Sequence, residues 1–462
     1  MSQAKIAVVA LAAGAGQRMR SALPKPLHPI AGLPMIEHVL RAAAGCAPVS
    51  VTVVLRPGNE AQIQAALGAG IRIAIQPEPL GTADAVKAAL PNTAGADLIL
   101  VLFADHPLLT VVTVQALMDS AETNRAKVTA LTCFVDDAAG YGRIERDAKN
   151  RPLRVVERKD DDPRLRVGTA EINSGLMAID ATWAQTAFPK IKPSVVTGEF
   201  YLPELVRLAA EEAVEGEDWP VATVTGRLDE LLGVNSRVEL AAAESMLRAR
   251  IRQEKMLGGV TLVSPETIVI DVDVEIGQDT TILPFTYLQV GTKIGTGCEI
   301  GPNSTIRNAE IGDDVRVTAS TIIESVMESG TDIGPYSHLR GGTVIRSGAH
   351  VGNFAEIKNS VLGAGARAGH FSYLGDAAVG ERTNIGAGTV TCNFDGVNKH
   401  RTKIGADAFI GSDSMLIAPL TIGDHARTGA GSVVNRDVAD GSTVVGAPAR
   451  PIGSKTLEKE KG

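Results

Sequence analysis

The sequence is poor in aromatic residues and in cysteine, and it carries no excess of positive charge. Phe, Trp and Tyr make up 3% of the 462 residues, and the formal net charge is −8. An acidic chain is a poor partner for nucleic acid or for an anionic membrane surface, so we expect it to bind neither. The cysteines form no C-x-x-C pair, which argues against a zinc site and a disulfide framework. They are Cys46, Cys133, Cys298 and Cys392.

Long hydrophobic runs are also missing. A transmembrane helix needs about 18 consecutive apolar residues, and no stretch of the sequence reaches that length. The opening KIAVVALAAGAG has a lysine, an apolar run and small residues, as a signal peptide does. Its apolar run is short, however, and leads into a Gly-rich turn followed by Arg18 and Arg20. We therefore interpret it as the first strand of the fold, and we expect a cytoplasmic protein without membrane insertion.

Glycine and aliphatic residues are abundant instead, and up to about residue 230 short apolar runs alternate with amphipathic stretches. The apolar runs predict strands at 6–11, 51–55, 71–75, 98–103 and 128–134, and the amphipathic stretches predict helices at 35–46, 60–70 and 83–90. Strands buried on both faces and joined by helices are typical of a parallel-rich, Rossmann-like α/β sheet. The segment 235–256 contains no Gly or Pro, which predicts a long linking helix.

From about residue 270 the aliphatic residues recur every six positions. The first series is Ile276, Ile282, Leu288, Ile294, Ile300 and Ile306, and the spacing slips at Ile311 and resumes at Ile333 and again at Ile404. A period of six fits a parallel β-helix, in which each hexapeptide supplies one short strand and one turn. With three faces it makes about ten coils, a rod of roughly 50 Å. The period alone does not set the handedness, and an inert spacer or trimerisation rod is the alternative to a functional domain.

Two features of the first half point to nucleotide chemistry. The stretch LAAGAGQRM (11–19) places a Gly-rich turn directly after a buried strand, where backbone N–H groups can approach a phosphate. Asp105 follows another apolar strand, and open α/β sheets bind ligands at such strand ends. A carboxylate beside a phosphate-binding turn suits Mg²⁺ that keeps part of its water shell. Taken alone, Arg18 and Lys25 would be ordinary surface charges and Asp105 a helix cap.

In order and spacing these segments resemble the sugar-nucleotide pyrophosphorylases. Further blocks similar to the uridylyl-transferring branch are LGTADA (80–85), YGRI (141–144), VVERKD (155–160), EINSG (171–175), GEFYLPEL (198–205) and GVNSR (233–237). The resemblance implies that Asp105 and Asn235 hold Mg²⁺ and that Arg18 and Lys25 contact the phosphates of UTP. It implies nucleotide or sugar contacts at Leu11, Ala12, Ala13, Gly14, Gln76, Gly81, Thr82, Gly142, Glu157, Asn173 and Asn235. Of these, Gln76, Gly81 and Thr82 frame uracil, and Gly142, Glu157 and Asn173 bind the N-acetylated sugar.

The chain departs from this family's usual pattern at three places. Gln17 stands where Thr is usual, Ala104 where Gly is usual, and Ala83–Asp84 where Gly-His is common. The departures leave the metal and phosphate groups in place but alter the surroundings of the nucleobase.

The hexapeptide region carries polar residues that its period does not require. HLRGG (338–342), NFAEIKN (353–359) and AGHFSYLGD (368–376) contain cations and His370, and the inserted loop within 384–405 contains Asn393, Lys399 and Arg401. A His of near-neutral pKa is the usual base for an amine attacking a thioester, and Asn donors can stabilise an oxyanion. The segment therefore favours acyl transfer to a sugar phosphate.

Over nearly its whole length the chain resembles the bifunctional N-acetylglucosamine-1-phosphate uridyltransferase/glucosamine-1-phosphate acetyltransferases. The resemblance implies a left-handed β-helix, a homotrimer with active sites between chains, and the supply of precursors for peptidoglycan and lipopolysaccharide. It implies His370 as the base, oriented by Asn393 and Tyr373. It implies glucosamine 1-phosphate contacts at Arg340, Lys358, Tyr373, Asn384 and Lys399, and acetyl-CoA contacts at Ala387, Asn393, Phe394, Ser412, Ala430 and Arg450. Phe394 replaces a frequent Tyr, so no hydroxyl acts there.

The sequence thus predicts a uridyltransferase domain at 1–234, a linker helix at 235–258 and an acetyltransferase domain at 259–462. N-acetylglucosamine 1-phosphate is the product of the second domain and the substrate of the first. A single-function nucleotidyltransferase with a purely oligomerising β-helix is one alternative, against which His370 and the inserted loop argue. A non-catalytic regulatory subunit is another, against which Arg18, Lys25, Asp105 and Asn235 argue.

Overall fold

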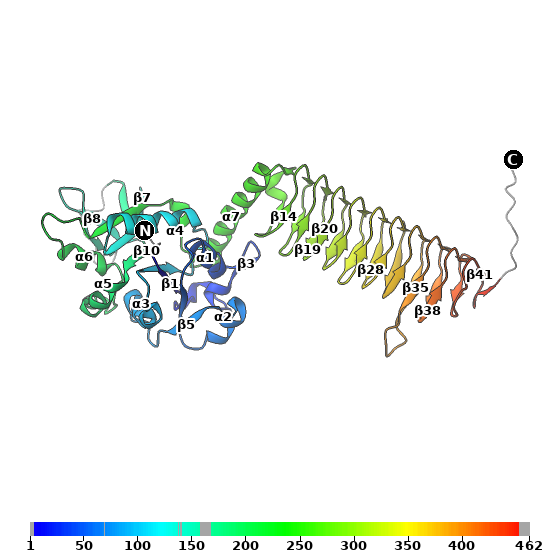
Figure 1. Cartoon of the computed structure of the whole chain (residues 1–462), viewed down its shortest axis with the longest axis horizontal. Helices are drawn as coiled ribbons and strands as arrows, with labels where there is room; N and C mark the ends of the chain where they lie inside the picture. Colours follow the sequence, from blue (N-terminus) through cyan, green and yellow to red (C-terminus); the bar gives the residue numbers. More distant parts are fainter. Residues whose placement is uncertain (1–3, 69, 137, 139–140, 158–167, 452–462) are drawn as a thin grey trace. The chain divides into compact units, whose positions relative to one another are not determined.

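The computed structural model describes residues 4–68, 70–136, 138, 141–157 and 168–451. The chain divides into two compact units, residues 1–247 and 248–462 (Figure 1). The division falls inside the long helix α7 (Arg237–Leu257), which confirms the predicted helix. The three-part division into 1–234, 235–258 and 259–462 stays a prediction. No helix in the described ranges is both long and apolar enough to span a bilayer.

The first unit is built on a sheet of order β11-β7-β10-β6-β1-β4-β5. Its strands are β1 (Ile6–Leu11), β4 (Ser50–Leu55), β5 (Arg72–Ile75), β6 (Leu98–Phe103), β7 (Val128–Val135), β10 (Ala170–Asp180) and β11 (Val221–Thr225), with β8 (Arg143–Arg146) and β9 (Pro152–Val156) attached through β10. Strands β5, β4, β1 and β6 pair in parallel, as predicted. β10 is antiparallel to both β6 and β7 and was not predicted.

Helices cover both faces of this sheet (Figure 1). They are α1 (Met35–Ala44), α2 (Glu60–Leu67), α3 (Thr82–Ala89), α4 (Val111–Asn124), α5 (Ala181–Ala187) and α6 (Glu204–Glu211). Because side chains alternate along a strand, Val9 of β1 packs with α3, α5 and α6, and Val8 packs with α1 and α4. The parallel strands therefore run through a core that is apolar on both sides, and their carboxyl ends remain for ligand contacts.

The second unit is a parallel β-helix, which confirms the hexapeptide prediction. Its described residues form three sheets of twelve, ten and nine strands. We call them the first, second and third sheets; they run from β12 (Thr261–Leu262) to β42 (Arg450–Pro451), from β13 (Val269–Ile270) to β40 (Val433–Val434) and from β14 (Glu275–Ile276) to β38 (Leu420–Ile422). The long parallel sheets are consistent with the expected left-handed β-helix.

The six-residue period arises because aliphatic side chains stack inside the prism. Ile282, Ile300 and Val317 are adjacent in register on successive coils and are fully buried. The corners take small polar residues, whose hydroxyls join neighbouring coils. Thr280 Oγ1 donates to the Gly295 carbonyl at 2.8 Å and accepts from the Cys298 amide at 3.1 Å. The scaffold thus uses the inward positions and the buried corner positions that precede the strands, and it leaves the more exposed positions free for function.

Candidate active sites

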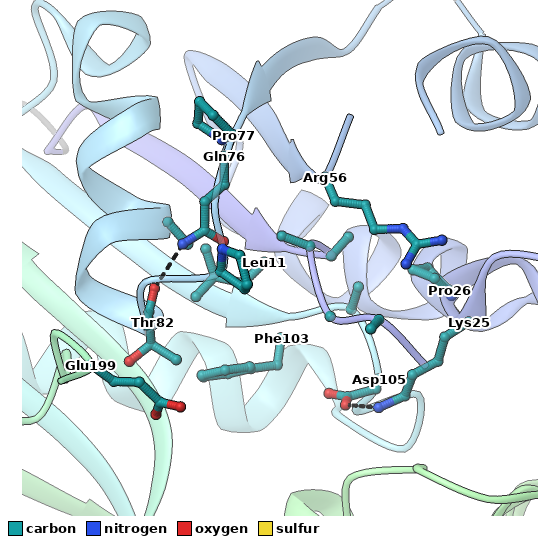
Figure 2. A pocket seen from close by; sticks show the side chains of 18 of the residues that line it. Leu11, Lys25, Pro26, Arg56, Gln76, Pro77, Thr82, Phe103, Asp105 and Glu199 are labelled. Carbon is teal, nitrogen blue, oxygen red and sulfur yellow. Dashed lines mark hydrogen bonds and ion pairs between the residues drawn. The ribbon is translucent and has the colours of Figure 1, made fainter. Parts of the chain in front are cut away.

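A cavity of about 590 Å³ opens at the carboxyl ends of the parallel strands of the first unit (Figure 2). Its lining contains nine of the predicted residues, namely Leu11, Ala12, Ala13, Gly14, Lys25, Gln76, Gly81, Thr82 and Asp105. The fold brings them together because the segments that follow β1, β5 and β6 emerge at one edge of the sheet. The Gly-rich turn also admits Lys25: Gly16 has φ of +61°, and a Cβ there would lie 3.0 Å from Lys25 Cβ.

Asp105, which lines this cavity, and Asn235 both accept hydrogen bonds from the ammonium group of Lys25. Lys25 Nζ donates to Asp105 Oδ2, as Figure 2 shows, and to Asn235 Oδ1 at 2.8 Å. The Asn235 segment is held beside Asp105 because the Val234 amide donates to the Asp105 carbonyl at 2.8 Å. Asp105 Oδ1 is buried and accepts no hydrogen bond within the described residues. The two side chains therefore present oxygen atoms to a cation, and one of these oxygens has capacity to spare.

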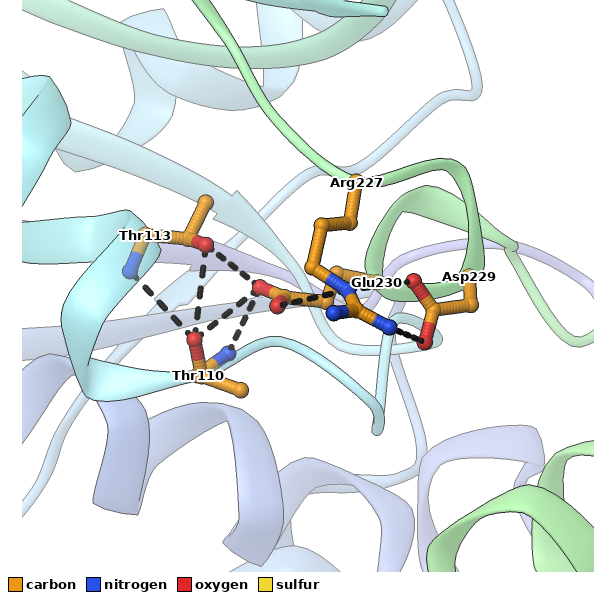
Figure 3. A network of polar contacts seen from close by, with 5 residues as sticks. All are labelled: Thr110, Thr113, Arg227, Asp229 and Glu230. Carbon is orange, nitrogen blue, oxygen red and sulfur yellow. Dashed lines mark hydrogen bonds and ion pairs between the residues drawn. The ribbon is translucent and has the colours of Figure 1, made fainter. Parts of the chain in front are cut away.

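A buried carboxylate anchors the segment that leads to Asn235 (Figure 3). Glu230, in the short turn η7 (Leu228–Leu231), is 4% exposed and accepts from Thr110 Oγ1 at 3.0 Å and from Thr113 Oγ1. Thr110 is the N-cap of α4, and its own hydroxyl accepts from the Thr113 amide. Because the chain reaches α4 directly from Asp105, this network joins the segments that carry Asp105 and Asn235. Its residues had not been predicted.

The predicted sugar-binding residues also form one cluster. The Asn173 amide donates to the Gly142 carbonyl at 2.8 Å, and a Cβ on Gly142 would lie 3.1 Å from Glu157 Oε1. Asn173 lies at a register shift in β10, and its Oδ1 is buried without a hydrogen-bond partner among the described residues. β-Bulges often redirect side chains at functional sites. Residues 158–160 of the block 155–160 lie outside the described residues.

Some cavity residues were not predicted, and five predicted residues do not belong to the lining: Arg18, Gly142, Glu157, Asn173 and Asn235. Arg56, Glu199 and Tyr201 line the cavity, and Arg56 follows β4 with no motif around it. Glu199 and Tyr201 fall within the block 198–205, which offered a signal. Arg18 lies in the short turn η1 (Gln17–Met19), is exposed and does not belong to the lining.

On the β-helix, basic side chains gather on the outer face of the second sheet. Arg340 of β25 (His338–Arg340) and Lys358 of β28 (Ala355–Lys358) are paired in register, and Lys358 pairs with Gly375 of β31 (Ser372–Gly375). Arg340 donates to Glu356 at 2.7 Å. Lys399 approaches from the inserted loop and lowers the pKa of Lys358, with a smaller contribution from Arg340. Two ammonium groups held this close together form a binding site for an anion such as a phosphate.

Tyr373 and Asn393 meet beside these cations, above Gly375. A Cβ on Gly375 would lie 2.5 Å from Tyr373 Oη and 2.8 Å from Asn393 Nδ2, so both groups occupy the space that a side chain would fill. Asn393 Nδ2 donates to Asp376 at 2.5 Å, and so does Asn359 Nδ2. Burial alone would raise the pKa of Asp376, but these hydrogen bonds and the nearby lysines bring it below its ordinary value. Asp376 had not been given a role from the sequence.

His370 belongs to a column of corner residues. By register, His370, Ala387, Ser412 and Ala430 each stand two residues after a strand of the first sheet ends, on four successive coils. The strands are β30 (Arg367–Ala368), β33 (Asn384–Ile385), β36 (Phe409–Ile410) and β39 (Arg427–Thr428). His370 is exposed and makes no hydrogen bond or ion pair within the described part of the chain. The column therefore places a reactive side chain at the end of a row of small residues.

The other predicted residues of this half are less closely associated. Asn384 begins β33 on the outer face of the first sheet. Phe394 is exposed and forms a β-bridge with Lys399 in the inserted loop. Arg450 lies in β42, and its guanidinium donates to the Ala449 carbonyl at 3.1 Å. No hydrogen bond or ion pair connects Arg450 with His370 or with the lysines among the residues that the structure describes.

The two halves together define a class of protein, a nucleotidyltransferase joined to a hexapeptide-repeat transferase. Residues 8–142 match the family model of the MobA-like NTP transferase domain. Residues 273–308 and 401–436 match the model of the bacterial transferase hexapeptide with six repeats.

Curated relatives match the chain along nearly its whole length. It is 42% identical over 443 residues to the bifunctional protein GlmU of Pelobacter propionicus, covering 95% of each chain. It is 41% identical over 460 residues to the bifunctional protein GlmU of Heliobacterium modesticaldum, covering 99% of each. It is 41% identical over 443 residues to the bifunctional protein GlmU of Burkholderia vietnamiensis, covering 94% of this chain and 95% of the relative. The chain belongs to the GlmU family, with a uridylyl-transferring and an acetyl-transferring half.

Proposed function

We propose that the two sites described above carry out successive steps in making UDP-N-acetylglucosamine. The β-helix site transfers an acetyl group from acetyl-CoA to glucosamine 1-phosphate, and the cavity of the first unit then transfers a uridylyl group from UTP to the product. The observation that supports this assignment best is the Lys25 ammonium, which donates to both Asp105 and Asn235 beside the Gly-rich turn. The product feeds peptidoglycan and lipopolysaccharide precursors, and a cytoplasmic location fits these substrates.

In the cavity, the phosphate oxygen of N-acetylglucosamine 1-phosphate attacks the α-phosphorus of UTP, and pyrophosphate leaves in line with it. Lys25 offsets the charge on the departing phosphates, and the N–H groups of the turn at 12–16 bind them. Arg18 joins this binding only if its exposed side chain turns inward. Gly142, Glu157 and Asn173 hold the sugar, where the unpartnered Asn173 Oδ1 accepts from an N–H or O–H donor.

The residues present fit a Mg²⁺ ion. Asp105 and Asn235 would hold it through their oxygen atoms, since Asp105 Oδ1 is buried without a hydrogen-bond partner among the described residues. Within these residues no group of three or more His, Cys, Asp or Glu side chains suits a metal, so the remaining ligands would be water and phosphate oxygens, as Mg²⁺ prefers. Bound there, Mg²⁺ supplies charge stabilisation to the phosphates.

On the β-helix, His370 takes the proton that the glucosamine amine loses as it attacks the thioester carbonyl; the C–S bond then breaks, and CoA leaves as a thiol that takes up this proton. Arg340, Lys358 and Lys399 bind the sugar phosphate, because their charges converge on one face of the second sheet. Tyr373 and Asn393 orient the reacting groups above Gly375. Acetyl-CoA binds along the column of corner residues formed by Ala387, Ser412 and Ala430. It also contacts Asn384, Phe394 and Arg450.

The functional assembly in this proposal is a homotrimer, with β-helices of neighbouring chains side by side. Tyr336 and Phe354 support it: they are 65% and 59% exposed, and their rings stack with centroids 5.5 Å apart on the outside of the prism. Phe371, next to His370, is exposed as well. Exposed aromatic residues in such a row mark a contact surface, and a second copy of this chain is the occupant that we propose. Sedimentation equilibrium of the full chain should give a trimer mass; a monomer would contradict the proposal.

Two substitutions test the two sites separately. Asp105→Asn should lower uridylyl transfer by at least about 10²-fold and leave acetyl transfer near normal, with Asp119→Asn on the exposed face of α4 as a matched control. His370→Ala should lower acetyl transfer by roughly 10²–10⁴-fold and leave uridylyl transfer intact, with His350→Ala as the control. Both rates are measured on one preparation, alongside its melting temperature. A folded His370→Ala protein with the full acetylation rate would disprove the role of His370.

A further inference from the structure

The side-chain amide of Gln76 is fixed by two acceptors. Gln76 follows β5, is 6% exposed and lines the cavity of the first unit. Its Nε2 donates to the Gly81 carbonyl, the bond that Figure 2 draws, and to Asp84 Oδ2, each at 3.0 Å. A backbone carbonyl and a carboxylate can only accept hydrogen bonds, so only the NH₂ end of the amide fits between them.

This arrangement leaves the amide oxygen for a ligand. Within the described residues Gln76 Oε1 accepts no hydrogen bond, and Gln76 belongs to the cavity lining. An acceptor that a bound ligand covers favours a donor and disfavours another acceptor. The side chain therefore selects for an N–H group at the edge of whatever base enters the cavity.

We propose that Asp84 is a positioning residue for nucleobase selection, which makes the cavity prefer uracil over cytosine. The proposal rests on the uridylyl transfer proposed above. Uracil carries N3–H, which donates to Gln76 Oε1, whereas cytosine presents an unprotonated N3 at the same place and two acceptors then face each other. Asp84 acts by holding the amide in the orientation that creates this difference.

The position of Asp84 suits this role. It lies in the first turn of α3, half-buried, where the helix dipole favours a negative charge. It stands in the pair Ala83–Asp84, at which this chain departs from the common Gly-His. The α3 N-terminus is itself held by the 198–205 segment, because the Ala83 amide donates to the Phe200 carbonyl at 2.9 Å. The carboxylate thus occupies a fixed point from which to orient Gln76.

The test compares UTP with CTP as substrates for the full-length wild type and for Asp84→Asn. Wild type should prefer UTP by about 10²-fold or more in kcat/KM. The amide introduced by the substitution can also donate, so Gln76 can then turn its NH₂ toward the N3 of cytosine. Because the Gly81 carbonyl still favours the original orientation, the preference should fall by about tenfold and not disappear. Glu78→Gln is the matched control: it removes one negative charge two residues from Gln76, its side chain makes no hydrogen bond or ion pair with Gln76 in the described structure, and it should keep the wild-type preference.

Several outcomes would overturn the proposal. One is an unchanged UTP preference in both folded variants, Asp84→Asn and Asp84→Ala. The second variant excludes an effect that is peculiar to Asn. A second is an equal fall in Glu78→Gln, which would make the effect one of charge alone. A third needs no variant, namely wild-type protein that uses CTP as well as UTP. If wild type transfers neither nucleotide, the proposed function itself fails, which is a distinct result.

Discussion

A single methyl group added at position 375 should disable acetyl transfer with little effect on folding. In Gly375→Ala the new Cβ would lie 2.5 Å from Tyr373 Oη, 2.7 Å from Tyr373 Cζ and 2.8 Å from Asn393 Nδ2. Ordinary contacts between such atoms are about 3.5–4.0 Å, so both side chains must move by about 1 Å. A displacement of that size can cost roughly 10²-fold in rate, and we expect acetylation to fall by about that factor.

The stability cost should be smaller, because the nearest atoms belong to side chains and not to the backbone. Overpacking a core typically costs about 1–3 kcal/mol, and Tyr373 is only partly buried, so we expect the lower end of that range. The assay is the acetylation rate per folded molecule, with uridylyl transfer measured on the same sample as an internal reference. Uridylyl transfer should not change.

A double-mutant cycle separates the clash from other effects. Tyr373→Phe removes the atom closest to the new methyl group, so Gly375→Ala should cost less acetylation in that background than in wild type. Gly369→Ala is the control substitution, since its Cβ would lie 3.8 Å from the nearest His350 ring atoms, an ordinary contact. Gly375→Ala with the full acetylation rate, or costs that simply add in the cycle, would refute the steric reasoning.

Two further predictions concern charged groups. Lys399 lowers the pKa of Lys358, so Lys358 loses the proton it needs to bind phosphate at a lower pH than an isolated lysine does. In Lys399→Gln the pKa of Lys358 should rise, so the alkaline increase in KM for glucosamine 1-phosphate should move to higher pH. Profiles of KM against pH for both proteins would show or exclude this shift. Thr113→Val removes a hydroxyl that donates to buried Glu230 and should lower the free energy of unfolding by about 1–3 kcal/mol; an unchanged melting temperature would mean that the remaining Thr110 contacts satisfy the carboxylate.

Patterns that repeat along the chain were predictable. The apolar run 6–11 became β1 with the same bounds, and the aliphatic period became the interior of the β-helix. These features depend on local burial, which a sequence records directly. β10 was missed because its pairing, antiparallel between β6 and β7, depends on partners about 35 to 80 residues away.

Site residues divide in a similar way. Those next to a motif, such as Lys25 and Asp105, were found, and the structure brings them into contact. Arg56 and Glu230 were missed because no local pattern marks them, and Asp376, although it lies in the block 368–376, was missed because its contacts are tertiary. The same holds for the bond between Gln76 and Asp84: the sequence marked Asp84 as a departure, and only the fold shows what it touches.

The β-helix explains why the proposed chemistry occupies the positions it does. Inward positions must be aliphatic because the interior of the prism is apolar, whereas the corner positions two residues after the strands of the first sheet are at least partly open to solvent. A row of small corner residues, Ala387, Ser412 and Ala430, therefore costs the scaffold nothing and leaves an open track along successive coils. His370 stands at the same corner position one coil earlier, so a long linear ligand on that track would present its end to the imidazole. The regular repeat of the β-helix thus produces the row of small corner residues, and His370 adds a reactive side chain at one end of that row.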